Sequence, residues 1–217
     1  MISPVATASS KGGFRVGEVE RAITALRHGR LAVIPTDTVY GLAANADDPR
    51  AAEALYAAKG REARRPTAVL FASVDELLAR VPELPPQSAA VARAVLPGAL
   101  TLVVPNPGRR FPWLNEERPE TLGVRVPDVT GAGREVLDAL GALVATSANL
   151  PGGTDPRTLA DVPPELLAAA AAVVDGGVLG GAPSTVVDLT GAEPGILREG
   201  AVPARSVLER LVPFTDR

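Results

Sequence analysis

The segment Leu31-Ala-Val-Ile-Pro-Thr-Asp-Thr-Val-Tyr-Gly-Leu42 decides the fold class of this chain. Its first four residues are apolar and stand between turn-forming residues, which is typical of a short strand buried on both faces. The apolar residues before the segment recur at helical spacing, namely Val16, Val19, Ile23 and Leu26. Because Gly29 favours the end of a helix, this part of the sequence predicts a helix followed by a buried strand.

The alternation of helix and strand continues along the sequence. Asp47, Asp48 and Pro49 form a start signal for a helix through Ala58, because carboxylates cap free amides and proline suits the first turn. Further strands are predicted at residues 67–71, 100–104, 122–126, 143–146, 172–174 and 185–189, and helices at 87–95, 133–140, 164–171 and 204–211. This pattern predicts one domain of the α/β (α+β) class over residues 1–217, with a twisted, mixed sheet and a loose first dozen residues.

The composition is that of an ordinary soluble domain. The chain has 217 residues, of which 46% are hydrophobic and 22% charged, enough for one sizeable core. No stretch approaches the roughly 20 apolar residues that span a bilayer, and the first dozen residues lack the pattern of a signal peptide. These features predict a cytoplasmic protein that does not enter a membrane.

Residue types that are absent exclude much of the common catalytic repertoire. The chain has no cysteine and one histidine, His28, so disulfides, thiolate zinc sites, cysteine nucleophiles and multi-histidine metal sites are excluded. A net charge of −3 gives no general attraction to nucleic acid or to anionic membranes. A small-molecule partner is therefore favoured.

Three hydroxyl groups, those of Thr36, Thr38 and Tyr40, follow the first strand. A chain that leaves a sheet at such a point presents hydroxyls and backbone amides to a ligand. The alternative interpretation is a structured turn whose hydroxyls bond to the local backbone. This segment alone does not decide between the two.

Two cations, Lys59 and Arg61, flank a glycine at the expected end of the helix over residues 49–58. Their charges repel unless an anion lies between them, which indicates a phosphate-bearing ligand. Lys59 is informative because the only other lysine is Lys11. The alternative is a basic helix end that complements the helix dipole.

Other polar residues stand among apolar ones. Ser147 and Asn149, in Ala145-Thr-Ser-Ala-Asn149, precede a Pro-Gly-Gly sequence and are typical of either a binding loop or a plain turn. Arg125 and Arg198 lie in apolar segments, where a planar guanidinium suits a carboxylate or phosphate ligand. A structural salt bridge is the ordinary alternative for both arginines. The sequence contains no glycine-rich phosphate-binding motif of the common kinds.

In this order and spacing, the segments PTDTVYGL, KGR, VRVP, SAN, STVVD and ILREG resemble the YrdC-like family of threonylcarbamoyl-AMP synthases, over about Val16 to Val202. The resemblance implies a twisted, largely open mixed sheet with flanking helices and a positively charged cavity on one side. It also implies that L-threonine, bicarbonate or carbon dioxide, and ATP are condensed to threonylcarbamoyl-AMP and pyrophosphate. The product would serve the threonylcarbamoyladenosine modification of transfer RNA by a downstream threonylcarbamoyl transferase complex.

The resemblance also implies roles for individual residues. The catalytic residues that it implies, next to the reacting groups, are Lys59, Arg61, Ser147 and Asn149. The same four residues would bind ATP, together with Thr121 and Arg198. Around L-threonine it places Thr36, Tyr40, Arg125, Ala145 and Ser184. We expect Arg125 to hold the threonine carboxylate. We expect Mg²⁺ to bridge phosphates with few protein ligands, and the sequence names no metal-binding residue.

The sequence departs from the family pattern at Glu62, where the family commonly has proline after Lys-Gly-Arg. A carboxylate next to the predicted phosphate clamp weakens it if the side chain points inward. One alternative is therefore a paralogue that adenylates a different carbamate or acid, akin to the carbamoyl-adenylating unit of hydrogenase maturation factors. Another is an RNA-binding module, against which the acidic balance and the few aromatic residues count. Weak RNA binding remains compatible with a concave basic surface.

Overall fold

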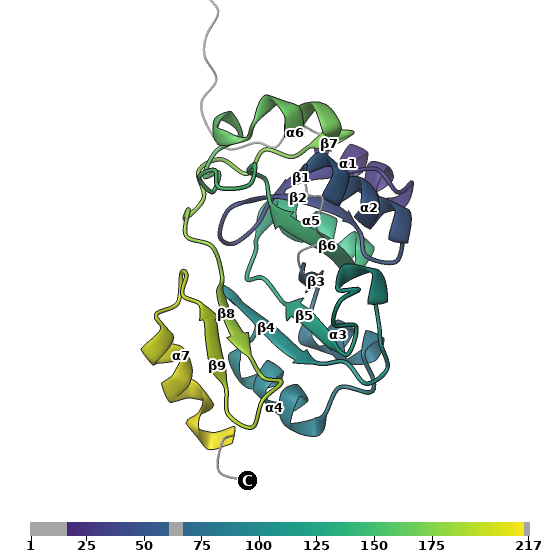
Figure 1. Ribbon diagram of the computed structural model, residues 1–217. Coiled ribbons are helices and arrows are strands. Elements are labelled where there is room, and N and C mark those ends of the chain that lie inside the picture. Colours follow the sequence, from purple (N-terminus) through teal and green to yellow (C-terminus); the bar gives the residue numbers. More distant parts are fainter. Residues whose placement is uncertain (1–16, 61–66, 215–217) are drawn as a thin grey trace, which may run out of the picture.

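The computed structural model describes residues 17–60 and 67–214 (Figure 1). Its α-helices are α1 (Glu18–Arg27), α2 (Pro49–Ala58), α3 (Val74–Arg80), α4 (Pro86–Val95), α5 (Gly131–Leu140), α6 (Pro164–Ala169) and α7 (Ala204–Leu211). Its strands are β1 (Ala32–Pro35), β2 (Tyr40–Asn45), β3 (Val69–Phe71), β4 (Leu100–Pro105), β5 (Thr121–Arg125), β6 (Ala142–Ser147), β7 (Ala172–Val173), β8 (Thr185–Asp188) and β9 (Gly195–Arg198). Short 3₁₀ turns are η1 (Pro112–Leu114), η2 (Leu159–Asp161) and η3 (Val212–Phe214).

The predicted helices and strands are confirmed, with shifts of a few residues at their ends. In α2, the Asp48 side chain accepts a hydrogen bond from Arg50 N (2.9 Å) and Pro49 occupies the first turn, so the start signal acts as expected. Three elements were not predicted, namely β2, α3 and β9. The segment after β1 is therefore a tight turn that returns immediately as the antiparallel strand β2.

All the strands join one mixed sheet in the order β7-β1-β2-β6-β3-β5-β4-β8-β9. The pairs β1–β7, β3–β5 and β4–β8 are parallel, and the remaining neighbours are antiparallel. The mixed sheet with flanking helices is as predicted. That the whole of residues 1–217 forms one domain stays a prediction, since the end segments are outside the described residues.

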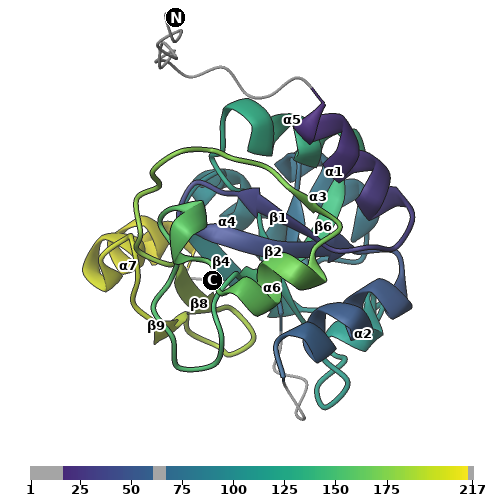
Figure 2. The ribbon, with the colours of Figure 1, turned by 90° about the horizontal axis from the view of Figure 1, so that it is seen from above.

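The sheet carries a hydrophobic cluster on each face. On one face, residues of α2, α3, α4, α6 and α7 pack against alternate residues of the strands. On the other face, α1 and α5 pack against alternate residues of β1, β2, β3, β6 and β7, for example Ile34, Ala43 and Leu143. Figures 1 and 2 show these helices arranged around the two sides of the sheet.

The second face is covered over only part of its width. Among the described residues, the cluster under α1 and α5 contains none from β4, β5 or β8. In these strands Leu102, Leu122 and Val187 point toward α4 and α7 and are buried. The intervening residues, such as Thr101 and Gly123, point to the opposite face, where they line a cavity.

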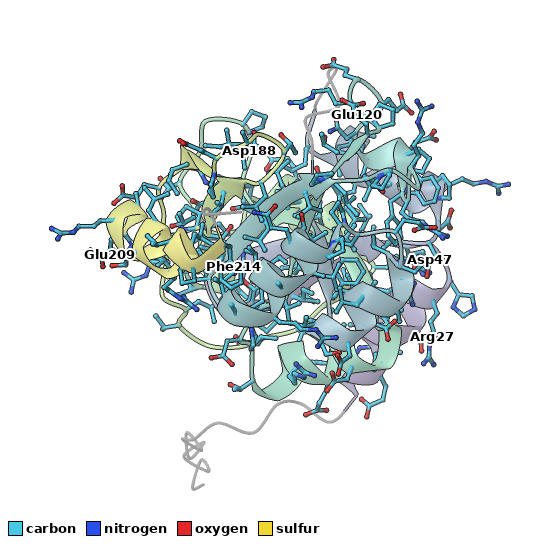
Figure 3. The ribbon with its side chains drawn as sticks, turned by 90° about the horizontal axis from the view of Figure 1, so that it is seen from below. Arg27, Asp47, Glu120, Asp188, Glu209 and Phe214 are labelled. Carbon is cyan, nitrogen blue, oxygen red and sulfur yellow. The ribbon has the colours of Figure 1, made fainter. Side chains whose placement is uncertain are left out.

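Charged side chains stand at the periphery of the molecule. The labelled side chains of Arg27, Asp47, Glu120 and Glu209 extend outward from it (Figure 3), and all four are exposed. Within residues 17–60 and 67–214, no helix has the length and apolar character needed to cross a membrane.

Candidate active site

A cavity of about 1010 Å³ lies over the uncovered part of the sheet. It is lined by eight of the predicted site residues, namely Thr36, Thr121, Arg125, Ala145, Ser147, Asn149, Ser184 and Arg198. These residues come from distant parts of the chain and meet because β2, β6, β3, β5, β4 and β8 are consecutive in the sheet. Lys59 and Tyr40 do not line the cavity, and Arg61 and Glu62 fall outside the described residues.

Thr36 forms the turn between β1 and β2. Its Oγ1 donates to the backbone oxygen of Val39 (2.7 Å) and accepts from the amides of Thr38 and Val39 (both 3.2 Å). The local-turn interpretation therefore describes the Thr36 hydroxyl in this structure. The residue still forms part of the cavity wall, so its hydroxyl contacts a ligand only if one of these bonds is shared.

Arg125 is almost fully buried and pairs with Asp37. One Nη2 hydrogen bond goes to Asp37 Oδ1 and another to Thr38 Oγ1 (3.0 Å), while Asp37 Oδ2 accepts from the Asp128 amide (3.0 Å). Burial lowers the pKa of the Arg125 guanidinium from its ordinary value, and the adjacent Asp37 carboxylate opposes that shift. The salt-bridge interpretation thus accounts for one nitrogen of the Arg125 guanidinium, whereas the buried Nε finds no hydrogen-bond acceptor among the described residues.

Lys59 lies behind the loop that follows β6 rather than in the cavity wall. It is only 1% exposed, and its Nζ donates to the backbone oxygens of Ser147 (2.7 Å) and Asn149 and to Asn149 Oδ1 (3.0 Å). A buried ammonium is stable only when its protons are accepted in this way. Lys59 thus holds the loop in this structure, and its predicted contact with a phosphate stays a prediction.

Tyr40 is likewise a supporting residue. It is fully buried at the start of β2, and its hydroxyl donates toward Asp175 Oδ1 (3.1 Å) and the Gly177 oxygen (2.8 Å). The hydroxyl also accepts from the Gly176 amide (2.9 Å). Burial, foremost, raises the pKa of Tyr40 to about 12. The hydroxyl fixes residues 175–177 beside β1, and Tyr40 is not among the residues that line the cavity, so its contact with the substrate stays a prediction.

At the other end of the cavity, Ser184 anchors Arg198. Two nitrogens of the Arg198 guanidinium donate to the Ser184 backbone oxygen (2.8 and 3.3 Å), and the Ser184 hydroxyl pairs with Thr101 Oγ1 (2.8 Å). Arg198 is exposed on the edge strand β9, so this cation has unhindered access to an anion. Thr121 holds the neighbouring loop, since its hydroxyl accepts from Asn115 Nδ2 (2.8 Å) and donates to the Arg118 oxygen (3.0 Å).

Two acidic residues at the site were not singled out from the sequence. Asp37 lies inside the polar segment after β1, and a lone arginine in an apolar strand was the signal that it needs a carboxylate partner. Asp155 lines the cavity and accepts hydrogen bonds from Ser147 Oγ (2.5 Å) and Asn149 Nδ2 (3.4 Å). No periodic pattern marks Asp155, because it follows a glycine-rich turn six residues after Asn149.

This arrangement suits positioning chemistry. The described wall offers two guanidinium groups, several hydroxyls and two side-chain amides, which are donors for phosphate and carboxylate oxygens. Such donors accelerate group transfer by orientation and by stabilising developing charge, without a covalent intermediate. The overall positive charge of the cavity stays a prediction, since Arg125 is paired with Asp37 and Arg61 falls in a stretch that the structure leaves undescribed.

Comparison with known proteins places the chain among a defined group. Residues 24–200 match the family profile Sua5–YciO–YrdC, whose description is telomere recombination. A relative in Pyrococcus abyssi, called threonylcarbamoyl-AMP synthase, is 34% identical over 183 residues, which cover 84% of this chain and 54% of that protein. A relative in Mycobacterium tuberculosis is 36% identical over 191 residues, covering 88% of this chain and 87% of that protein.

A solved structure shares the fold. The crystal structure of Pyrococcus abyssi Sua5 complexed with L-threonine superimposes with a TM-score of 0.81 and 31% sequence identity. The match covers 89% of this chain and 57% of the Sua5 chain, so this chain spans little more than half of the archaeal protein. The resemblance noted in the sequence is thus confirmed at the level of family and fold.

Proposed function

Because the chain belongs to the Sua5–YciO–YrdC family, we propose that it is a threonylcarbamoyl-AMP synthase. The amine of L-threonine and carbon dioxide, supplied by bicarbonate, form a carbamate with a new N–C bond. A carbamate oxygen then attacks the α-phosphorus of ATP, and the bond from that phosphorus to the bridging oxygen breaks, which releases pyrophosphate. This reaction needs alignment and charge neutralisation rather than a protein nucleophile.

The observation that carries the proposal is the incompletely paired guanidinium of Arg125. Among the described residues its buried Nε has no hydrogen-bond acceptor, and an unpaired buried donor costs free energy. Because Arg125 lines the cavity, a carboxylate that enters can accept hydrogen bonds from this guanidinium. We assign the threonine carboxylate to this position, with Thr36, Ala145 and Ser184 around the amino acid. Tyr40 contributes indirectly through residues 175–177.

We assign the nucleotide to the rest of the cavity. Arg198 and Thr121 lie on the side of β9 and β5, while Ser147 and Asn149 lie at the end of β6. Arg61 would add a cation beside Gly60, which lines the cavity. Lys59 would act by fixing the carbonyl groups of Ser147 and Asn149, so that both side chains face the reacting phosphate.

Other parts of the proposal rest on the family alone. We propose ATP as a substrate bound with Mg²⁺, a cytoplasmic location, and delivery of the product to the threonylcarbamoyl transferase complex that acts on transfer RNA. Weak RNA binding is a secondary possibility that a salt titration would expose, since affinity for RNA falls steeply as salt rises.

The decisive experiment is pyrophosphate release by the purified protein. We expect release only when ATP, L-threonine and bicarbonate are all present, and we expect omission of any one to abolish it. A panel of amino acids would identify a paralogue, because a different acid would then replace threonine. No release with any amino acid would refute the synthase assignment.

The Arg125→Lys variant tests whether Arg125 binds L-threonine rather than ATP. Lysine keeps the positive charge beside Asp37 but lacks the planar fork, so we expect the KM for L-threonine to rise about tenfold or more while the KM for ATP changes less than about threefold. Arg134→Lys is the matched control, since Arg134 pairs with Asp138 on the surface of α5. Equal loss of affinity for both substrates would contradict the assignment of Arg125 to the threonine carboxylate.

A further inference from the structure

We propose that the carboxylate of Asp155 is the protein ligand for the Mg²⁺ ion that accompanies ATP. This inference rests on the proposed function and deepens it, because it names a metal-binding residue where the sequence had indicated none. Within the described residues, no group of three histidine, cysteine, aspartate or glutamate side chains gathers to hold a metal ion. A single carboxylate that works together with phosphate oxygens is the usual protein contribution to such a Mg²⁺ ion.

The first argument is electrostatic. Of the described residues that line the cavity, Asp155 alone is acidic. A carboxylate in a cavity for a triphosphate and a carboxylate substrate repels both ligands unless a cation lies between them. Arg125 does not supply that cation, because its pairing partner is Asp37, and within the described residues Arg198 bonds to Ser184 and forms no ion pair with Asp155. A cation that enters with the nucleotide removes the repulsion and explains an acidic residue at this place.

The second argument is the hydrogen bonding of Asp155. Both of its bonds, from Ser147 Oγ and from Asn149 Nδ2, go to the same oxygen, Oδ1. Oδ2 accepts no hydrogen bond from the described residues, although the side chain is only partly exposed. One oxygen thus fixes the orientation of the carboxylate, and the other is available as a ligand. Carboxylate oxygen is the donor that Mg²⁺ prefers.

The position of Asp155 also fits the proposed chemistry. Its two partners, Ser147 and Asn149, are the residues that we place at the reacting phosphate, and Lys59 holds the same loop from behind. A metal ligand bonded to these side chains is therefore close to the phosphate oxygens. The bond from Ser147 would in addition orient the carboxylate, as hydrogen bonds to metal ligands commonly do.

The test measures nucleotide binding, in the absence of threonine, by calorimetry with Mg²⁺ or with EDTA. For Asp155→Asn we expect the gain in ATP affinity caused by Mg²⁺ to fall at least about tenfold, because the variant lacks the charged ligand. Electron paramagnetic resonance with Mn²⁺ and ATP gives a second readout, in which the variant should leave more Mn²⁺ unbound to protein. Asp155→Ser, which keeps a hydrogen-bonding group in an otherwise exposed turn, should behave like Asp155→Asn.

Glu193→Gln is the control for charge, since Glu193 is an exposed carboxylate on the turn between β8 and β9 and should leave the effect of Mg²⁺ unchanged. If Asp155→Asn binds ATP more tightly by the same factor with and without Mg²⁺, Asp155 merely competes for Ser147 and Asn149, and the inference is wrong. An unchanged effect of Mg²⁺ would also overturn it while leaving the synthase assignment intact. If the wild-type protein binds no ATP, both proposals fail.

Discussion

One face of the sheet is built in two different ways. Over β7, β1, β2 and β6 it is covered by α1 and α5, and its residues are apolar, such as Ile34, Ala43 and Leu143. Over β5, β4 and β8 the same face is uncovered, and the corresponding positions hold residues such as Thr121 and Thr101. The other face of these strands is apolar in both regions.

This difference shows that the pattern of polar and apolar side chains along a strand depends on what covers each face of the sheet. A strand with helices on both faces is apolar throughout, whereas a strand with one open face alternates between apolar and polar or small residues. In β5, Leu122 and Val124 alternate with Thr121, Gly123 and Arg125. The cavity is therefore the open part of the sheet, and the covered part serves to hold it in place.

The largest loss of stability should come from a substitution that disturbs the close packing between the sheet and the helices α1 and α5. A Cβ atom added at Gly133 in α5 would lie 2.3 Å from the backbone oxygen of Pro35, so Gly133→Ala should lower the free energy of unfolding by about 3 kcal/mol. Gly41→Ala in the cavity wall is the control, because its Cβ would have no neighbour closer than 3.6 Å and should change stability by less than about 0.5 kcal/mol. Urea denaturation measures the free energy of unfolding of both variants. Equal losses would contradict the view that the region under α1 and α5 is more tightly packed than the cavity wall.

A smaller loss of stability is expected when the buried ammonium of Lys59, behind the cavity, is removed. Lys59→Met leaves the backbone oxygens of Ser147 and Asn149 without their donor, which should cost about 2 kcal/mol of stability. Pyrophosphate release should fall more than the stability loss explains, because the loop with Ser147 and Asn149 loses its position. Urea denaturation and release assays at saturating ATP measure the two effects. A rise in the KM for ATP with unchanged kcat would instead indicate that Lys59 contacts the nucleotide directly.

The smallest effect concerns Tyr40 and its dependence on pH. The pKa of Tyr40 rises from 10.0 to about 12 on folding, so its neutral form is favoured in the folded chain. The contribution of the Tyr40 hydroxyl to the free energy of unfolding is intact below about pH 10. It is lost as the pH rises toward 12, because in that range only the unfolded chain releases the phenolic proton. Tyr40→Phe should cost about 1 kcal/mol at pH 8. Denaturation between pH 8 and 12 should show a shallower alkaline decline for Tyr40→Phe than for the wild type, and parallel curves would refute the role of the hydroxyl.

Much of the fold could be predicted from the sequence, and the missing elements have physical reasons. β2 reads Tyr-Gly-Leu-Ala-Ala-Asn, a strand of mostly small residues buried on both faces, so it shows neither alternation nor β-branched residues. α3 is too short for a helical period, although its start signal was present, since Ser73 accepts from the Glu76 amide (3.0 Å). β9 is an exposed edge strand whose formation depends on pairing with β8.

The site could be predicted as a set of residues but not as a set of contacts. Eight of the predicted residues do line one cavity, which the resemblance to a family had implied. The sequence could not show that Lys59 points to the loop behind the cavity, because that contact spans about ninety residues. Nor could it show that Arg125 pairs with Asp37, since the two are joined only by the folding of β3 and β5 beside β6.

The uncovered strand face also determines the calorimetric character of binding. Its threonine and serine hydroxyls stand in the cavity wall beside apolar residues such as Leu70, Val103 and Val186, so a ligand meets polar and apolar surface together. Substrates that enter therefore exchange hydrogen bonds with water for hydrogen bonds with the protein and also bury hydrocarbon. The buried hydrocarbon should give binding a negative heat-capacity change.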